Sequence, residues 1–88
     1  MSLLNQPMQI GNVKGTIYTF EQAGDILPMH THDTTTAHIT IVARGIVKAH
    51  GNDWEAEYSA GAIIDFPAEQ SHEFTALEDN SRIVNIIK

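Results

Sequence analysis

The 88-residue sequence contains no cysteine, so no disulfide can cross-link the chain and no thiolate can bind a metal or attack a substrate. It also has few basic residues: five Lys and Arg against eleven Asp and Glu give a formal net charge of −6. Such a surface repels phosphate backbones, so we expect no nucleic-acid partner. No apolar run is as long as a membrane span, and the N-terminus lacks the basic and apolar regions of a signal peptide. We therefore expect a cytoplasmic protein that does not associate with membranes.

Hydrophobic and polar residues alternate with a period of two, which is the pattern of β-strands. No segment has the periodicity of a helix. Strand-like segments recur about every ten residues with Gly, Pro and Asn between them, at 13–20, 38–44, 46–50, 54–58, 62–66, 72–77 and 82–88. The pattern predicts an all-β protein, either an antiparallel sandwich or a barrel.

The length fits a single domain over residues 1–88, with a barrel core from about residue 13 to 88. Residues 1–8 are expected to be a loose N-terminal arm or an edge strand exchanged with another subunit. A core this small is modest, so a bound metal or a partner subunit is the remaining means of adding stability.

Four histidines stand in or beside predicted strands and are the candidate metal ligands: His30, His32, His38 and His72. Residues i and i+2 of a strand share a face, so His30 and His32 project together if this segment is a strand. Neutral imidazole is a common ligand of divalent transition metals. The fifth histidine, His50, adjoins a Gly-Asn-Asp turn and is expected to be exposed.

The same alternation identifies the residues that would face a ligand beside these histidines. Thr40 and Val42 share the side of His38, and Phe74 and Ala76 share the side of His72. We predict that these four residues line a mostly apolar pocket for a small organic molecule. For Val42 and Phe74, the alternative is that they fill the core with their own side chains.

The opposite side of the 38–44 segment carries Ile39, Ile41 and Ala43. Three apolar residues on an outer face require a cover, which predicts a homodimer. The strand aromatics Tyr18, Trp54 and Tyr58 are expected to pack in the core or at that interface.

The histidine spacing resembles the first sequence motif of the cupin superfamily. That motif has a glycine, five residues, a His-x-His pair, a glutamate a few residues later, and a glycine six residues beyond. This chain has Gly24, five residues, His30 and His32, and then His38 followed by six residues and Gly45. His38 stands where the family has glutamate, after a turn one or two residues longer than the usual one.

The second cupin motif is matched further along the chain. Gly61 is followed by five residues and Pro67, and His72 stands at the histidine position. Glu69 and Ala76 replace the family's second glycine and its asparagine. The two motifs together span residues 24–76, over half of the chain. The sequence therefore resembles a small single-domain cupin. This resemblance implies a double-stranded β-helix of the jelly-roll kind.

The resemblance also implies one metal held by His30, His32, His38 and His72, or by three of them if His38 points away. Imidazole ligands suit Fe, Ni, Zn and Cu, and Mn remains open. Thr40 lies on the same side of its strand as His38, so its hydroxyl is a candidate to orient one of the imidazole rings. Cupin sites usually keep positions open for water or substrate, whereas four protein ligands closing a tetrahedron would make a structural zinc site.

Three functions follow from these features. The first is a metal-dependent enzyme of the dioxygenase, isomerase or lyase type, which acts on a small oxygen-rich molecule in the barrel. The second is a non-catalytic, metal-dependent module that binds or senses a small molecule. The third is a domain whose metal is only structural. The motif favours the first without identifying a catalytic residue, and the shortness of the chain, which leaves little room for a lid, counts against it.

Overall fold

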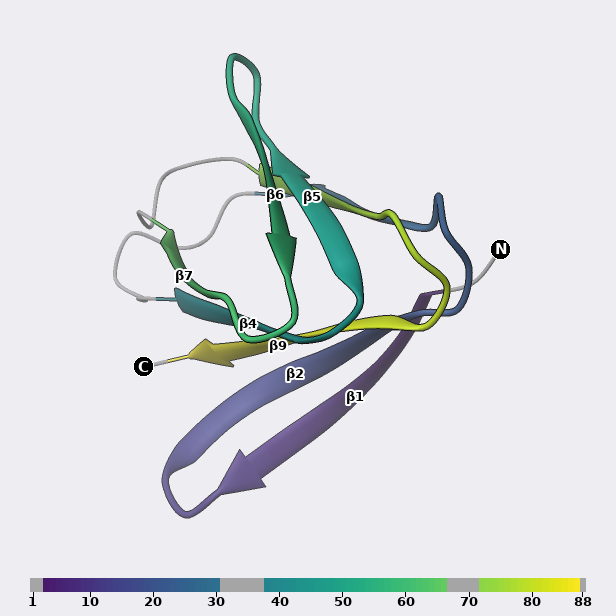
Figure 1. Ribbon diagram of the computed structural model, residues 1–88. Coiled ribbons are helices and arrows are strands. Elements are labelled where there is room, and N and C mark those ends of the chain that lie inside the picture. The colour runs from purple at the N-terminus through teal and green to yellow at the C-terminus, as the bar shows by residue number, and fades with distance from the viewer. Residues whose placement is uncertain (1–2, 31–37, 67–71, 88) are drawn as a thin grey trace.

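The computed structural model describes residues 3–30, 38–66 and 72–87, and all regular structure in these segments is β-strand (Figure 1). None of these residues forms a helix that is long and apolar enough to cross a membrane. The strands in chain order are β1 (Leu3–Ile10), β2 (Val13–Phe20), β3 (Ile26–His30), β4 (His38–Arg44), β5 (Ile46–His50), β6 (Glu55–Ser59), β7 (Ile63–Phe66), β8 (His72–Ala76) and β9 (Ser81–Ile87).

The strands form two antiparallel sheets that face each other across one core. One sheet has five strands in the order β1-β2-β9-β4-β7, and the other has four in the order β3-β8-β5-β6. Consecutive strands repeatedly cross from one sheet to the other, as from β4 to β5 and from β8 to β9. This arrangement is a jelly roll, and it confirms the all-β fold class predicted from the period-two pattern.

The core lies between the sheets and is built from the alternate residues of each strand. Its buried apolar side chains are Phe20, Val42, Val47, Ala49, Ile64, Phe74, Ala76 and Ile83. The polar residues Asp25, Thr40, His72, Ser81 and Asn85 are buried at other inward positions. The core therefore contains several polar side chains, whereas the alternating strand pattern predicted mainly apolar ones.

Gly45 connects β4 to β5 at a crossing between the two sheets. Its φ angle is +77°, a conformation that residues with a Cβ rarely adopt. The side-chain Oγ and Cβ atoms of Ser81, together with its Cα atom, pack against the place where a Cβ would stand. The glycine of the first motif is therefore required by both the dihedral angle and the space available.

The strands that the sequence predicted end within about a residue of the observed ones, for instance at β6 and β9, whereas β3 was not among the predicted segments. The main difference is at the N-terminus, where a loose arm or a strand exchanged with another subunit was expected. Leu3–Ile10 forms β1, an edge strand of the five-stranded sheet that pairs with β2 of the same chain over its full length, so it is not a loose arm. Exchange of this strand with another subunit stays a prediction. In Figure 1 these two strands form a hairpin that projects beyond the rest of the molecule.

Candidate metal centre

The register of the four-stranded sheet brings two of the predicted histidines together. The Cα atoms of His30 in β3 and His72 in β8 are direct partners in the antiparallel pair. Directly opposed residues of such a pair have Cβ atoms about 4.5–5.5 Å apart. The His72 side chain is fully buried, and its ring meets that of Phe74 edge to face, with centroids 5.6 Å apart.

For His32 and His38, the structure describes only the backbone of His38. His38 begins β4 in the five-stranded sheet, where its Cα partners are Phe66 and Ile87. His32 lies outside the described residues, as do the side chains of His30 and His38. Within the part of the chain that is described, no three His, Cys, Asp or Glu side chains form a metal-binding group. The four-histidine site therefore stays a prediction.

The four residues predicted to face a ligand all point into the core. Thr40, Val42, Phe74 and Ala76 are each at most 1% exposed. Three of them belong to the apolar core cluster, and their contact with a ligand stays a prediction. Thr40 differs, because its Oγ1 donates a hydrogen bond of 2.6 Å to Oδ1 of Asn85.

Asn85 is a buried polar residue that the sequence interpretation did not single out. It is 5% exposed and is the β9 partner of Thr40 in the sheet register. A signal was present in the sequence, because the alternation around Ile83 also turns Asn85 inward. An amide at such a position needs a partner inside the protein, and Thr40 provides one.

His50 was expected to be exposed, and this expectation is wrong. Its side chain is 27% exposed, and its Nε2 lies 2.9 Å from Oε2 of Glu73 on the neighbouring strand β8. His50 occupies the outer face of the four-stranded sheet, where Nζ of Lys48 and Oε2 of Glu55 form an ion pair of 3.7 Å. It is separated from His72 by the sheet itself, which makes it a natural control for His72.

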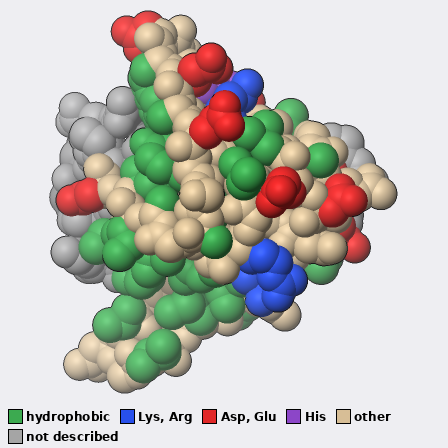
Figure 2. All heavy atoms as spheres, viewed as in Figure 1, with side chains coloured by type: hydrophobic (Ala, Val, Ile, Leu, Met, Phe, Trp, Pro, Cys, Tyr) green, Lys and Arg blue, Asp and Glu red, His purple; other side chains and the backbone are tan. Residues whose placement is uncertain are grey.

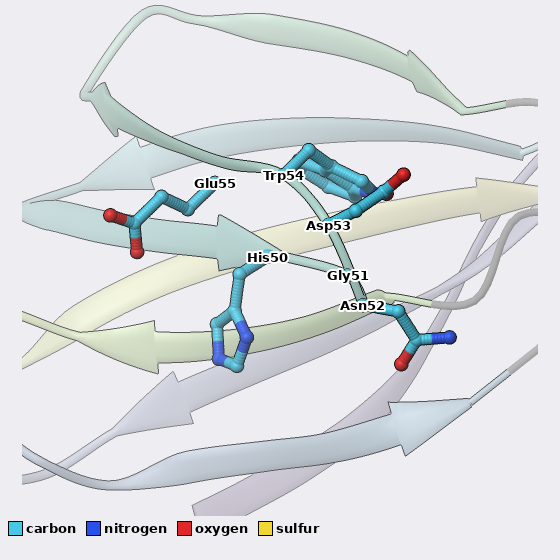
Figure 3. A pocket seen from close by; sticks show the side chains of 6 residues that line it. All are labelled: His50, Gly51, Asn52, Asp53, Trp54 and Glu55. Carbon is cyan, nitrogen blue, oxygen red and sulfur yellow. The ribbon is translucent and has the colours of Figure 1, made fainter.

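An open hollow of about 350 Å³ surrounds the turn between β5 and β6. It is lined by His50, Gly51, Asn52, Asp53, Trp54 and Glu55 (Figure 3). In Figure 3 the Trp54 ring points away from the imidazole of His50. The turn therefore presents an aromatic residue on one side and a histidine–carboxylate pair on the other.

No protein-family model and no curated protein sequence matches this chain. Solved structures do match it. An RmlC-like cupin protein from Desulfovibrio desulfuricans is 24% identical, with a TM-score of 0.83 over 97% of this chain and 80% of that one. KdgF from Halomonas sp. is 17% identical, with a TM-score of 0.82 over 97% of this chain and 76% of that one.

A third similar structure is the Cupin_2 domain of an XRE family transcriptional regulator from Enterobacter cloacae. It is 10% identical, with a TM-score of 0.83 over 99% of this chain and 96% of that one. At such identities these likenesses establish the fold alone. The chain has the fold of a small cupin barrel, as the two sequence motifs predicted.

Proposed function

We propose that this chain binds a divalent transition metal and, beside it, a small oxygen-rich organic molecule, and that it acts on that molecule as an enzyme. The proposed ligands are His30, His32, His38 and His72. The observation that carries the proposal is the register of β3 and β8, which pairs His30 with a fully buried His72.

The donor chemistry fits such a metal. A buried imidazole on the core face, beside a second histidine of the neighbouring strand, suits Fe, Ni, Zn or Cu better than Mg or Ca, which prefer oxygen ligands. A bound metal of this kind would supply a Lewis acid that polarises a substrate oxygen. The chain itself would hold the imidazoles in place and exclude water through the apolar residues Val42, Phe74 and Ala76.

Metal analysis of the purified protein and two variants tests this proposal. The variant His72→Phe keeps an aromatic ring in the core but removes both nitrogens, whereas His50→Gln removes an imidazole from the opposite face of the same sheet. We expect one metal ion per chain in the wild type and in His50→Gln. We expect His72→Phe to lose more than about 100-fold in affinity, the upper range reported for removing an outer-shell partner of a metal ligand.

Full metal content in a folded His72→Phe protein, or no metal in the wild type, would contradict the proposal. His38→Ala then decides the size of the ligand set: a marked loss identifies a fourth ligand, and unchanged content means that three suffice. Iron together with substrate-dependent oxygen uptake supports the dioxygenase form of the proposal. Tight zinc without an exchangeable water supports a structural metal instead.

The second candidate function is a non-catalytic binding or sensing module. It is favoured by the likeness to the Cupin_2 domain of the transcriptional regulator, because the match covers almost all of that domain. A change in the metal's spectrum on adding a ligand, without turnover, would support this alternative. A cytoplasmic location remains part of either proposal.

We also propose that a second copy of the chain covers the outer face of the five-stranded sheet. Ile17, Val84, Ile41 and Ile63 form one cross-strand row on this face, and Ile63 is 70% exposed. Figure 2 shows hydrophobic side chains gathered over the neighbouring β1–β2 hairpin. A stable dimer buries about 800 Å² per partner, so light scattering should report a dimer that Ile63→Lys converts to a monomer. A monomeric wild type would contradict this.

A further inference from the structure

One row of residues crosses the core face of the four-stranded sheet at the level of His72. β5 pairs with β8 through His50 and Glu73, so the next residue, Gly51, stands level with His72. On its other side, the amide of Gly51 donates a hydrogen bond of 2.9 Å to the carbonyl oxygen of Trp54. The row therefore runs His30, His72, Gly51, Trp54, from β3 and β8 to the residue just after β5 and the residue just before β6.

Gly51 leaves room in this row for the side chain of Trp54. A Cβ atom at Gly51 would collide with the Nε1, Cδ1 and Cε2 atoms of that indole. The pyrrole edge of Trp54 therefore lies over the Gly51 backbone. The ring is half-buried and packs against the apolar core cluster, which places it on the same side of the sheet as His72.

The distance from the indole to the candidate metal centre follows from the spacing of strands. Neighbouring strands lie about 4.8 Å apart, so a ring that covers β5 is about one strand spacing from β8, where His72 stands. The half-buried state of Trp54 means that one part of the ring contacts the core while another remains accessible.

We propose that Trp54 is a specificity-determining residue that forms a wall of the ligand site beside His72, and that it selects a flat, oxygen-bearing molecule. This inference rests on the proposed metal centre at His72. An indole in this position offers a rigid planar surface, and such surfaces favour planar partners through stacked or edge-to-face contacts. A puckered, saturated ring of the same size makes fewer of these contacts.

The first experiment uses Trp54 as its own reporter, because the chain contains a single tryptophan. Co²⁺ is added to metal-free protein while its binding is measured by equilibrium dialysis and the indole emission is recorded. We expect the emission to be quenched in step with Co²⁺ binding. In Gly51→Ala, which displaces the indole but alters no imidazole, we expect Co²⁺ still to bind with weaker quenching.

The control is Gly11→Ala, at the β1–β2 turn, where an added Cβ meets no atom within 4 Å. This variant should show the same quenching as the wild type. Bound Co²⁺ without a change in emission would overturn the inference and leave the proposed metal centre intact. Failure of Co²⁺ to bind would overturn both.

The second experiment measures selectivity on the Co²⁺-loaded protein with benzoate and cyclohexanecarboxylate, which share a carboxylate but differ in ring shape. We expect benzoate to bind about 2- to 10-fold more tightly, the ratio that corresponds to one aromatic contact. Trp54→Leu should remove this preference without changing Co²⁺ content, and Trp54→Tyr should retain it. Equal affinities in the wild type, no binding of either acid, or an unchanged preference in Trp54→Leu would overturn the inference.

Discussion

The buried hydrogen bond between Thr40 and Asn85 provides a quantitative test of how the core is held together. Thr40→Val removes the hydroxyl with little change of shape and leaves the Oδ1 atom of Asn85 buried without this donor. The two residues are 1% and 5% exposed, so water cannot readily replace the donor. An unsatisfied buried acceptor costs about 1–3 kcal/mol, and we expect Thr40→Val to lower the free energy of unfolding by this amount.

The double variant Thr40→Val/Asn85→Leu distinguishes a hydrogen bond from simple packing. Replacing both partners with apolar groups of similar shape leaves no unsatisfied atom, so the pair should be nearly neutral. We therefore expect the double variant to be destabilised by less than the sum of the two single variants, with a coupling energy of about 1–2 kcal/mol. The measurement is urea unfolding followed by circular dichroism, with the slope m unchanged among the variants.

Thr19→Val is the matched control for this cycle. The Thr19 hydroxyl accepts a hydrogen bond of 3.1 Å from Nε of Arg82 on the outer face of the same sheet. Water can replace that bond, so the change in unfolding free energy should stay within about 0.5 kcal/mol. The reasoning is refuted if Thr40→Val also stays within this range, or if the single and double variants are additive to within about 0.3 kcal/mol.

Three further predictions concern the core, a turn and the metal. Phe74→Ala should lower the unfolding free energy by about 3–5 kcal/mol, whereas Ile10→Ala, at a 72% exposed position, should change it by less than about 0.5 kcal/mol in the same urea assay. Gly45→Ala should cost at least about 1–2 kcal/mol because of its positive φ, with a lower thermal midpoint; an unchanged midpoint contradicts this. Chelation, or a pH below about 5 to 6, should remove the metal because imidazole binds metal only when neutral; if the thermal midpoint does not fall, the metal does not stabilise the fold.

Most strands could be predicted because each of them carries a local signal. In β4 the inward Thr40 and Val42 alternate with the half-buried Ile39 and Ile41, and Gly45 ends the strand where the chain turns. The strand β1 lacked this signal. Most of its residues are exposed, and Pro7 stands in its middle, which only an edge strand tolerates. Its pairing with β2 becomes visible only once the sheet is assembled.

The interpretation of His50 failed for a related reason. Its neighbours in sequence, Gly51 and Asn52, form a turn, and local composition therefore predicted exposure. The residue that partly covers it, Glu73, belongs to a strand far along the chain. Contacts between strands depend on which strands pair, and a period of two specifies the face of each residue without specifying its partner.

The same distinction applies to the candidate site: the sequence predicts which face of a strand a residue occupies, but not which residue of the next strand lies beside it. Alternation correctly indicated that Phe74 and Ala76 share an inward face with His72, because this depends on one strand alone. The row that joins His72 to Gly51 and Trp54 depends on the order and register of three strands. Read as separate residues, Trp54 was one more strand aromatic and Gly51 one more turn glycine. Only their register shows that the missing side chain of one makes room for the ring of the other, on the face where His72 is buried.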